Sequence, residues 1–548
     1  MMNDSLILLI VIPFMGALVC LGCKFFRTSW LAPLACMIAL IACCAQLMRV
    51  YPALLHARQA TYIVGGWSAV VGIRQLFDGL AWIGCALVMT ISLVVLLFVM
   101  SEQRYGYTFY FFYLLMIAGM TGVLLAADLF NLFVFFEILG ITVYILIAYC
   151  QERHALVASF KYLMLSSLGI TFFLLGIFII YQQTGSLSFY EIAQYAPQSS
   201  RDASRLSFAL AALVAGISIR TAYIPFHVWL PDAYASAPHP VSAILSGAVG
   251  KVSFLAIWRL VLSFEATAFR ALFFWLGAAT ALVAVIYALS QTDCKKLLAW
   301  HSISQVGYIL VGFGVKDSVA SVGSIYHLIN HALFKTLLFL CIGSVITITG
   351  ERNIKHLGYL GRHVPLLMVL FSVGALSIMG IPPFNGFISK KLIETGVKDS
   401  PFISSILWVA GVGTMASFLK LSAIFRRNPY QQTGESYPLK ACSALKYASL
   451  IFLAFLCCLT GIAASFFSGQ IARLLFGHPL QETVHVYSAA NMFKTGMSLV
   501  FGFGVYLAVL SHTGHRLTAF IRKQHLSFQS SLIWCILGFV LLAVYAGW

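Results

Sequence analysis

Long apolar runs separated by short polar loops make up most of the chain. Each run holds roughly 18 residues or more, which suits a membrane-spanning α-helix, whereas the strands of a membrane barrel are shorter and alternate in polarity. The runs cover residues 5–23, 31–49, 78–100, 108–126, 128–149, 159–181, 206–230, 240–263, 269–290, 297–314, 320–347, 365–398, 402–425, 445–467, 493–511 and 531–547. We therefore expect an all-α polytopic membrane protein with about 14–16 transmembrane helices.

Two apolar stretches are interrupted by proline and carry embedded charge. The first stretch, 211–251, has four prolines, and the second, 377–391, has a proline pair followed by Gly386. The prolines are Pro225, Pro231, Pro238, Pro240, Pro382 and Pro383. Proline blocks helix continuation, and irregular backbone survives in a bilayer only where protein or a water-filled cavity satisfies it. A broken helix in each half is the pattern of a transporter built from repeats.

Composition supports a membrane protein. Hydrophobic residues make up 61% of the 548 residues and charged residues 9%, against about 25% charged residues in soluble domains. The net charge of +17 comes from Lys and Arg that lie mostly between helices, so it does not indicate a nucleic-acid partner. Alternation of basic and less basic loops places both termini on the outer (periplasmic) side of a cell (inner) membrane. The first helix begins almost at Met1 without a basic n-region, so we expect it to be retained.

No cofactor site is visible in the sequence. The 13 cysteines are scattered through apolar segments, and the one CxxC pair, Cys20 and Cys23, has no second pair at zinc or iron–sulfur spacing. The chain has no GxxxxGK[ST] phosphate loop and no strand–GxGxxG–helix unit. We expect no metal and no cofactor, and a redox partner would lie on another chain. A stand-alone enzyme is the least favoured class, because no nucleophile–base set stands out.

Glu137 differs from the other carboxylates of the first half. Asp78 and Asp128 stand at helix starts, where an N-cap is expected, whereas Glu137 lies about nine residues into its helix, near the middle of the bilayer. An ion there costs about 2.5–3.5 kcal/mol on insertion scales and marks a functional site. Arg220, also inside a helix, is its natural partner. The alternative is a carboxyl that stays protonated and only holds helices together.

A second set of basic side chains lies deep in later helices. Lys251 is too far from either helix end to reach the membrane surface by snorkelling. His327, His331 and Lys335 follow at i, i+4 and i+8, on one stripe of a helix. Two histidines at i and i+4 can hold zinc, but no carboxylate completes the set. The open alternatives are core hydrogen bonding and a hydrated proton relay, and the relay is favoured.

Further candidates lie near the two breaks and the helix ends. Lys390, beyond the second proline pair, is expected to be embedded, whereas the neighbouring lysine points elsewhere. Lys420 is expected to snorkel to the inner surface. His301 either joins the relay or lies at the inner membrane surface. The secondary candidates are His227, Asp232, His301, Lys391 and Lys420.

Five motifs resemble those of the antiporter-like membrane subunits. They are DLFNLFVFFEI, PFHVWLPDAYASAPHPVSAILSG, LLAWHSISQVGYI, HALFKTLLFL and GIPPFNGFISK. That family includes proton-pumping subunits of respiratory complex I, subunits of membrane-bound hydrogenases and large subunits of Mrp-type sodium/proton antiporters. GGWSAVVGI and DLFNLFVFFE look most like the Mrp branch formed by the D subunits. The resemblance covers about residues 65–425.

The resemblance implies a domain plan. After the N-terminal helices, 1–107, two inverted five-helix repeats would occupy 108–263 and 269–425, with breaks near 220–240 and 377–391. The segment 426–548 would add a loop and extra transmembrane helices, of which the last two or three are expected to carry no embedded charge.

The resemblance also implies roles for individual residues. Glu137 matches the family's glutamate of the first repeat, Lys251 the lysine after the first break, Lys335 the central lysine and Lys390 the terminal lysine. His327 and His331 match polar residues of the central hydrated axis. Arg220 departs from the family, which usually has lysine there, and arginine cannot release a proton in proteins.

The expected function is that of a proton-translocating subunit of a multisubunit membrane complex, most similar to a Mrp-type cation/proton antiporter. Its partners would be other membrane subunits, the lipid bilayer and protons, with sodium as a second candidate ion and no nucleic acid. One alternative is a proton-pumping subunit of a complex I-like or hydrogenase-like redox complex. Another is a non-conducting structural subunit that keeps the fold.

Overall fold

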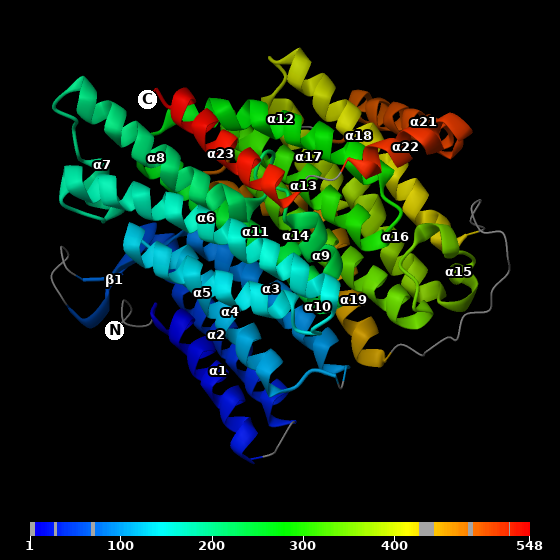
Figure 1. The fold of residues 1–548 in the computed structure, drawn as a ribbon, viewed down its shortest axis with the longest axis horizontal. Helices are drawn as coiled ribbons and strands as arrows, with labels where there is room; N and C mark the ends of the chain where they lie inside the picture. Colours follow the sequence, from blue (N-terminus) through cyan, green and yellow to red (C-terminus); the bar gives the residue numbers. More distant parts are fainter. Residues whose placement is uncertain are drawn as a thin grey trace.

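The computed structural model describes residues 6–26, 30–66, 72–102, 104–426, 443–480, 486–524 and 527–547. Most of this chain is helical (Figure 1). The first elements are α1 (Leu8–Phe26), α2 (Leu31–Ala57), β1 (Gln59–Ile63), β2 (Arg74–Asp78), α3 (Gly79–Met100), α4 (Tyr107–Leu125), α5 (Leu129–Ile147), α6 (Arg153–Thr184), α7 (Phe189–Ala193), α8 (Ser200–Thr221), α9 (Leu230–Ser236), α10 (His239–Ile244), η3 (Leu245–Val249) and α11 (Gly250–Ser263). The later elements are α12 (Thr267–Ser290), α13 (Cys294–Gly314), α14 (Ser318–Thr349), α15 (Leu360–His363), α16 (Pro365–Met379), α17 (Asn385–Gly396), α18 (Pro401–Ser422), α19 (Ala444–Ile462), α20 (Ala464–Phe476), α21 (Ala489–Leu510), α22 (His512–Lys523) and α23 (Phe528–Tyr545).

The predicted helical, multi-pass class is confirmed. Among the described residues, 14 helices are long and apolar enough to cross a membrane, and α1 and α16 add two shorter apolar helices. One small departure is the antiparallel hairpin of β1 and β2, in which Gln59 pairs with Asp78. The two predicted N-caps are also present. Asp78 accepts a hydrogen bond from the backbone N–H of Ala81 at 2.8 Å, and Asp128 accepts one from Asn131 at 2.6 Å.

Both predicted helix breaks are present. The gap between α8 and α9 begins at Ala222 and the gap between α16 and α17 begins at Gly380, and both residues have left-handed backbone, with φ of 60° and 75°. The first predicted stretch is interrupted a second time, between α9 and α10. The relation of 108–263 to 269–425 as inverted repeats stays a prediction.

Protein groups satisfy the irregular backbone at the first break. The indole N–H of Trp229 donates to the carbonyl of Ile219 at 2.6 Å, and the backbone N–H of Ile224 donates to the hydroxyl of Thr280 at 3.2 Å. Such pairing is what allows non-helical backbone at membrane depth. Hydrogen bonds with side chains therefore stabilise the irregular backbone of this break.

Facing glycines bring two helix pairs close together. A Cβ on Gly169 of α6 would lie 2.9 Å from the carbonyl oxygen of Gly216 on α8. A Cβ on Gly307 of α13 would lie 2.5 Å from the carbonyl oxygen of Gly277 on α12. Small residues allow the backbones to approach closely, and the resulting van der Waals packing contributes to helix association in membranes.

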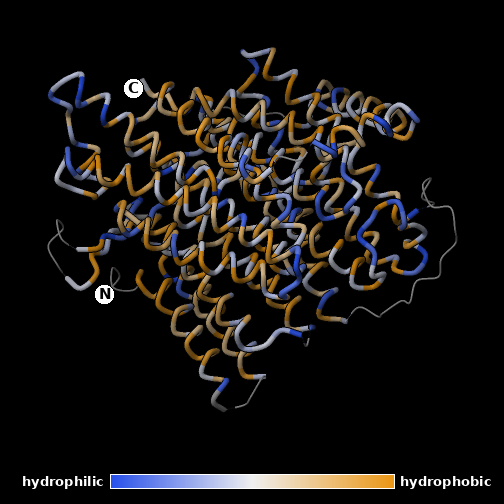
Figure 2. Tube along the Cα trace, in the orientation of Figure 1, coloured by the Kyte–Doolittle hydropathy of each residue, from blue (hydrophilic) through white to orange (hydrophobic). Residues whose placement is uncertain are grey.

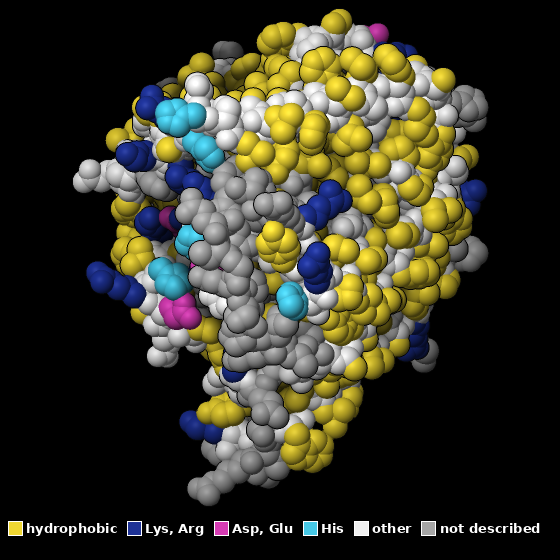
Figure 3. All heavy atoms as spheres, turned by 90° about the vertical axis from the view of Figure 1, so that its right-hand side faces the viewer, with side chains coloured by type: hydrophobic (Ala, Val, Ile, Leu, Met, Phe, Trp, Pro, Cys, Tyr) yellow, Lys and Arg dark blue, Asp and Glu magenta, His cyan; other side chains and the backbone are white. Residues whose placement is uncertain are grey.

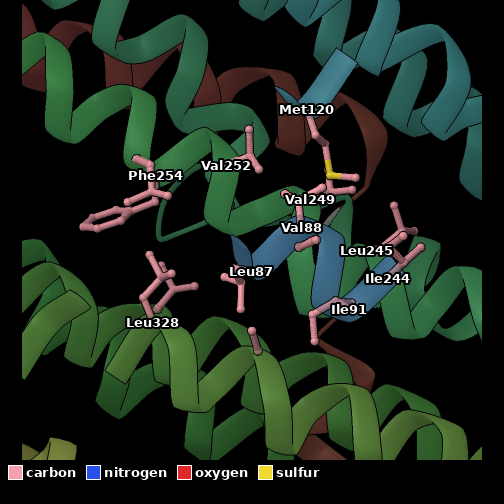
Figure 4. Packing of buried hydrophobic residues seen from close by; sticks show 14 of the residues in the cluster. Leu87, Val88, Ile91, Met120, Ile244, Leu245, Val249, Val252, Phe254 and Leu328 are labelled. Carbon is pink, nitrogen blue, oxygen red and sulfur yellow. The ribbon is translucent and has the colours of Figure 1, made fainter. Parts of the chain in front are cut away.

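Helix α14 lies inside the bundle and packs against α10, α13, α16, α17 and α19. Nearly all of its side chains are buried. Figure 4 shows part of the core beside it, where Leu87 of α3, Met120 of α4, Val252 of α11 and Leu328 of α14 gather. Polar side chains on α14 are therefore surrounded by other helices of this chain, away from lipid.

Apolar side chains cover much of the outer surface. Figure 2 shows hydrophobic positions along most helices, with many of the hydrophilic positions in the connecting segments. Figure 3 shows one side of the molecule, where hydrophobic side chains cover a broad area. Large residues such as Ile462 and Phe493 are 72% and 71% exposed. Apolar surface of this extent suits contact with lipid or with other membrane subunits.

The loops gather at two ends of the bundle. At one, called here the Asp293 end, Arg352 pairs with Asp293 at 3.0 Å and donates to the carbonyl of Ala235 at 2.6 Å. At the other, called the Asp78 end, Arg259 pairs with Asp78 at 2.7 Å. The helices cross between these two ends, so a path from one end to the other would cross the membrane.

The C-terminal helices pack onto the outside of the earlier bundle. Helix α19 lies against α3 and α14, α21 against α18, and α23 against α8, and α22 has no buried residue (Figure 1). One charged residue of the last spans, Lys494, lies near the start of α21 with its side chain 37% exposed. Lys494 of α21 forms an ion pair with Glu394 of α17 at 2.9 Å.

Candidate functional site

Glu137 on α5 and Arg220 on α8 form an ion pair, as expected. Oε1 of Glu137 lies 3.2 Å from Nη2 of Arg220, and the guanidinium lies over the ring of Phe136 with its Cζ 5.4 Å from the centroid. Gly140, one turn after Glu137, leaves room for Arg220, because a Cβ there would lie 2.6 Å from Nη1. Arg220 is 4% exposed and Glu137 is 40% exposed. The pair therefore joins the interior of the bundle to the surface of this chain.

Lys251 and Lys335 are linked through α13. The ammonium of Lys251 donates to the carbonyl of Ser246, in the π-helical segment η3, where a wider turn changes the usual helical hydrogen bonding. The hydroxyl of Ser246 lies 2.9 Å from that of Ser302, which donates to the carbonyl of Leu298 at 3.2 Å. The ammonium of Lys335 donates to the same carbonyl. One row of polar atoms thus runs from α11 to α14.

The histidines continue this row along α13 and α14. His301, His327 and His331 are fully buried, and the rings of the last two stack with centroids 6.2 Å apart. Nδ1 of His327 lies 2.9 Å from the hydroxyl of Ser389 on α17. His301 is thus in the interior, and the alternative of a position at the membrane surface is wrong.

Several polar atoms in this row have no protein partner. They are both ring nitrogens of His301 and of His331, Nε2 of His327 and both amide atoms of Gln305. Buried polar groups are nearly always hydrogen-bonded, and internal water is the usual partner where the protein supplies none. The polar atoms without protein partners therefore indicate that this region can hold internal water.

Lys390 lies where the second break frees carbonyl groups. Its ammonium donates to the carbonyl of Ile378, at the end of α16, at 2.7 Å and lies 5.1 Å from the centroid of the Tyr308 ring. Glu394 follows one turn later on α17 and forms ion pairs with Lys391 and Lys494, each at 2.9 Å. A cavity of about 40 Å³ is lined by Lys390, Lys391 and Glu394 and by residues of α18 and α21.

A second cluster lies beside the first break, at the Asp293 end. Asp232 on α9 pairs with Lys161 on α6 at 3.2 Å and with Lys296 on α13 at 3.0 Å. His227, 8% exposed, lies in the break with its Nδ1 unpaired. A cavity of about 330 Å³ is lined by these groups and by aromatic side chains that include Trp300. Each break therefore carries a cavity, a carboxylate and two lysines paired with it.

Not all of the candidate residues are linked to one another in the structure. Among the described residues, no protein hydrogen bond links the Glu137–Arg220 pair to Lys251. Lys420 is 5% exposed and donates to the carbonyls of Leu289 and Gln291 at 2.8 and 2.7 Å. The predicted snorkelling of Lys420 is therefore wrong, because the end of α12 offers it carbonyl groups inside the protein.

Sequence reasoning missed some charged residues of both clusters. Glu394 stands three residues after Lys391 on one helix, which is a signal for an ion pair. Lys161, Lys296 and Lys494 come from distant segments, and no spacing connects them with their carboxylates. For metal, the described residues contain no group of three or more His, Cys, Asp or Glu side chains placed to hold an ion.

The relatives found by comparison with known proteins are membrane subunits of an antiporter and of a quinone oxidoreductase. Residues 126–419 match the family described as NADH:quinone oxidoreductase/Mrp antiporter, transmembrane. The D subunit of the Na⁺/H⁺ antiporter of Alkalihalophilus pseudofirmus is 31% identical over 431 residues, covering 77% of this chain and 86% of the relative. The N subunit of the NADH-quinone oxidoreductase of Desulforudis audaxviator is 34% identical over 410 residues, covering 72% and 80%.

Solved structures show the same fold. A chain of the Mrp complex from Dietzia sp. DQ12-45-1b superimposes with a TM-score of 0.79 at 23% identity, covering 89% of this chain and 99% of that one. A chain of an archaeal respiratory membrane complex, the membrane-bound sulfane sulfur reductase, gives 0.78 at 24% identity, covering 90% and 99%. On the sequence match over more than half its length, this chain belongs to the NADH:quinone oxidoreductase/Mrp antiporter transmembrane family.

Proposed function

We propose that this chain translocates protons as a membrane subunit of a multisubunit complex that carries out Mrp-type cation/proton antiport. The observation that carries the proposal is the row of buried polar groups from Lys251 through Ser302 to Lys335. Three lysines and one arginine in the membrane would cost on the order of 10–14 kcal/mol on insertion scales. That is close to the whole stability of a typical protein, about 5–15 kcal/mol, so such groups persist only with a function and with partners.

The two clusters at the breaks would serve as the two mouths of the path. The cavity beside His227 and Asp232 would admit protons at the Asp293 end, and the cavity beside Lys390 and Glu394 would release them toward the Asp78 end. Between them, the path would run along Lys251, Lys335 and the histidines of α14. Lysine and histidine can take up and release protons at these positions.

The Glu137–Arg220 pair would couple proton movement to a partner. Arginine keeps its proton, so the pair can only open or close electrostatically. The half-exposed carboxylate lies at the surface of this chain, where an adjoining membrane subunit could change its surroundings. Moving one charge through 100 mV requires about 2.3 kcal/mol, which the partner subunits or an ion gradient must supply.

We infer that the protein lies in the cell membrane with the Asp78 end outward and both termini outside. Basic residues such as Arg104, Lys296, Arg352 and Arg522 lie at the opposite end, which supports this orientation under the positive-inside rule. Its partners would be other membrane subunits, because the relatives of similar fold come from multisubunit complexes.

A redox-driven pump is the second candidate, supported by the relative from an NADH-quinone oxidoreductase. The two candidates differ in what drives the proton. In vesicles holding the purified complex, a sodium pulse should collapse a preformed proton gradient if the complex is an antiporter. If only an added electron donor moves protons, the antiporter proposal fails and the redox pump is supported. If neither treatment moves protons, a structural subunit remains.

A further inference from the structure

A large cavity at the Asp78 end takes no part in the proton path. It has a volume of about 500 Å³ and lies between the end of α2, the start of α3, the end of α11 and helix α20. We call it the arginine cavity. Its charged lining residues are Arg58, Asp78, Arg259 and Arg473. These residues lie outside the proposed proton path along Lys251, Lys335 and Lys390.

Positive charge dominates the arginine cavity. Its one carboxylate, Asp78, already accepts hydrogen bonds from Arg259 at 2.7 Å and from the backbone N–H of Ala81 at 2.8 Å. Among the described residues, no group accepts a hydrogen bond from the side chain of Arg58 or Arg473. The guanidinium of Arg58 instead packs against Gly477, where a Cβ would lie 2.6 Å from its Cζ. Two exposed guanidinium groups at the cavity therefore have no ion-pair partner within the described part of the chain.

Arg259 also lines the arginine cavity, and protein acceptors hold its guanidinium group. It is 8% exposed, and its Nη1 donates to the carbonyls of Leu124 and Ala126. Its Nε is buried and has no protein partner. A guanidinium carries five N–H donors, and leaving one of them buried and unpaired is costly. Arg259 therefore adds a largely buried positive charge to the wall of the cavity.

The remaining walls combine apolar side chains with the neutral polar residues Gln59, Ser263 and Gln470. Leu54, Leu80, Trp258, Leu262, Leu474 and Phe476 line the cavity together with the arginines. An inorganic anion would use the guanidinium groups but leave these walls uncovered, whereas a phospholipid would cover both. Arginine binds phosphate oxygens in bidentate fashion, and basic pockets between transmembrane helices bind anionic headgroups.

We propose that the arginine cavity binds an anionic phospholipid of the adjoining leaflet. Its phosphodiester would lie among Arg58, Arg259 and Arg473, and an acyl chain would follow the apolar wall of α11 and α20. The lipid would then tie α20, which comes late in the chain, to α2 and α3 at the start. The bound lipid would stabilise the packing of α20 at the membrane-facing edge of the bundle and would leave the proton path unchanged.

Binding can be measured on the complete complex by native mass spectrometry, with phosphatidylglycerol or phosphatidylcholine added in detergent. Phosphatidylglycerol should remain bound after phosphatidylcholine has left. Arg473→Gln and Arg58→Gln should each weaken retention about five-fold, the effect of one basic residue near a lipid surface. Arg201→Gln, an exposed arginine at the start of α8, is the matched control and should retain the lipid as the wild type does.

Three outcomes would overturn the proposal. They are equal retention of the two lipids, retention unchanged in both cavity variants, and loss of phosphatidylglycerol on adding millimolar inorganic phosphate at constant ionic strength. The last outcome would assign the site to a free phosphate ion. Melting temperatures of the variants show whether each one is folded, and none of the three substitutions removes a buried side chain, because Arg58, Arg473 and Arg201 are all exposed.

Discussion

Glu137 and Arg220 are joined 3.2 Å apart, with the carboxylate 40% exposed and the guanidinium 4% exposed. Because arginine cannot release its proton, this pair acts by its charge alone. We expect Arg220→Lys to keep most of the proton flux and Arg220→Ala to lose most of it. The measurement is quenching of a pH-sensitive dye in vesicles holding the complex. Equal flux in both variants and in Glu137→Ala would show that the pair is structural.

Gly140→Ala tests the pair without removing either charge. The added Cβ would lie 2.6 Å from Nη1 of Arg220, so the guanidinium must move. We expect a loss of flux of about tenfold, which corresponds to about 1.4 kcal/mol on the barrier. Gly504→Ala on α21 is the control, because nothing lies within 4 Å of the added carbon. Unchanged flux in Gly140→Ala would show that the position of Arg220 is unimportant.

Ser302→Ala interrupts the row between Lys251 and Lys335. The Ser302 hydroxyl lies 2.9 Å from that of Ser246, and no other side chain on α13 makes that contact among the described residues. The flux should fall while the fold is kept. Ser304→Ala is the matched control, since that hydroxyl, on the same helix, donates to the carbonyl of Ala281 on α12. A similar loss in both variants would point to packing and not to the row.

The loop after α14 gives a prediction on pH. Burial raises the pKa of Glu351, but hydrogen bonds from the backbone N–H groups of Asn353 and Arg352 and from His356 outweigh it, so the pKa is below its ordinary value. A carboxyl with a lowered folded pKa stabilises the fold above the unfolded pKa, and this contribution is lost as pH falls through the folded value.

The difference in stability between wild type and Glu351→Gln should therefore shrink as pH falls below about 4.3, the ordinary glutamate value. Thermal unfolding of both proteins at a series of pH values measures it. A difference that stays constant across the acidic range would show that the ionised carboxylate does not hold this loop.

The sequence was sufficient to predict the membrane-spanning helices and the positions of the two breaks. Apolar runs of spanning length predicted the bundle, and prolines such as Pro225 and Pro382 marked both interruptions, since proline cannot continue a helix. Glu137 and Arg220 were recognisable because charge is costly inside apolar runs.

Contacts between distant segments could not be predicted. Lys494 lies 100 residues from Glu394, and Lys161 lies 71 residues from Asp232, so no local spacing connects them. Lys420 was misjudged for the same reason. A lysine near a helix end resembles a snorkelling side chain, and only the fold shows that the carbonyls closing α12 lie within its reach.

The central claim is that Lys251, Lys335 and Lys390 act in series along one proton path. The most direct test is proton flux in vesicles with each lysine replaced by alanine, singly and in pairs. A series path predicts that each single variant loses nearly all flux and that pairs lose no more. A single variant with wild-type flux, or losses that add from one lysine to the next, would contradict it.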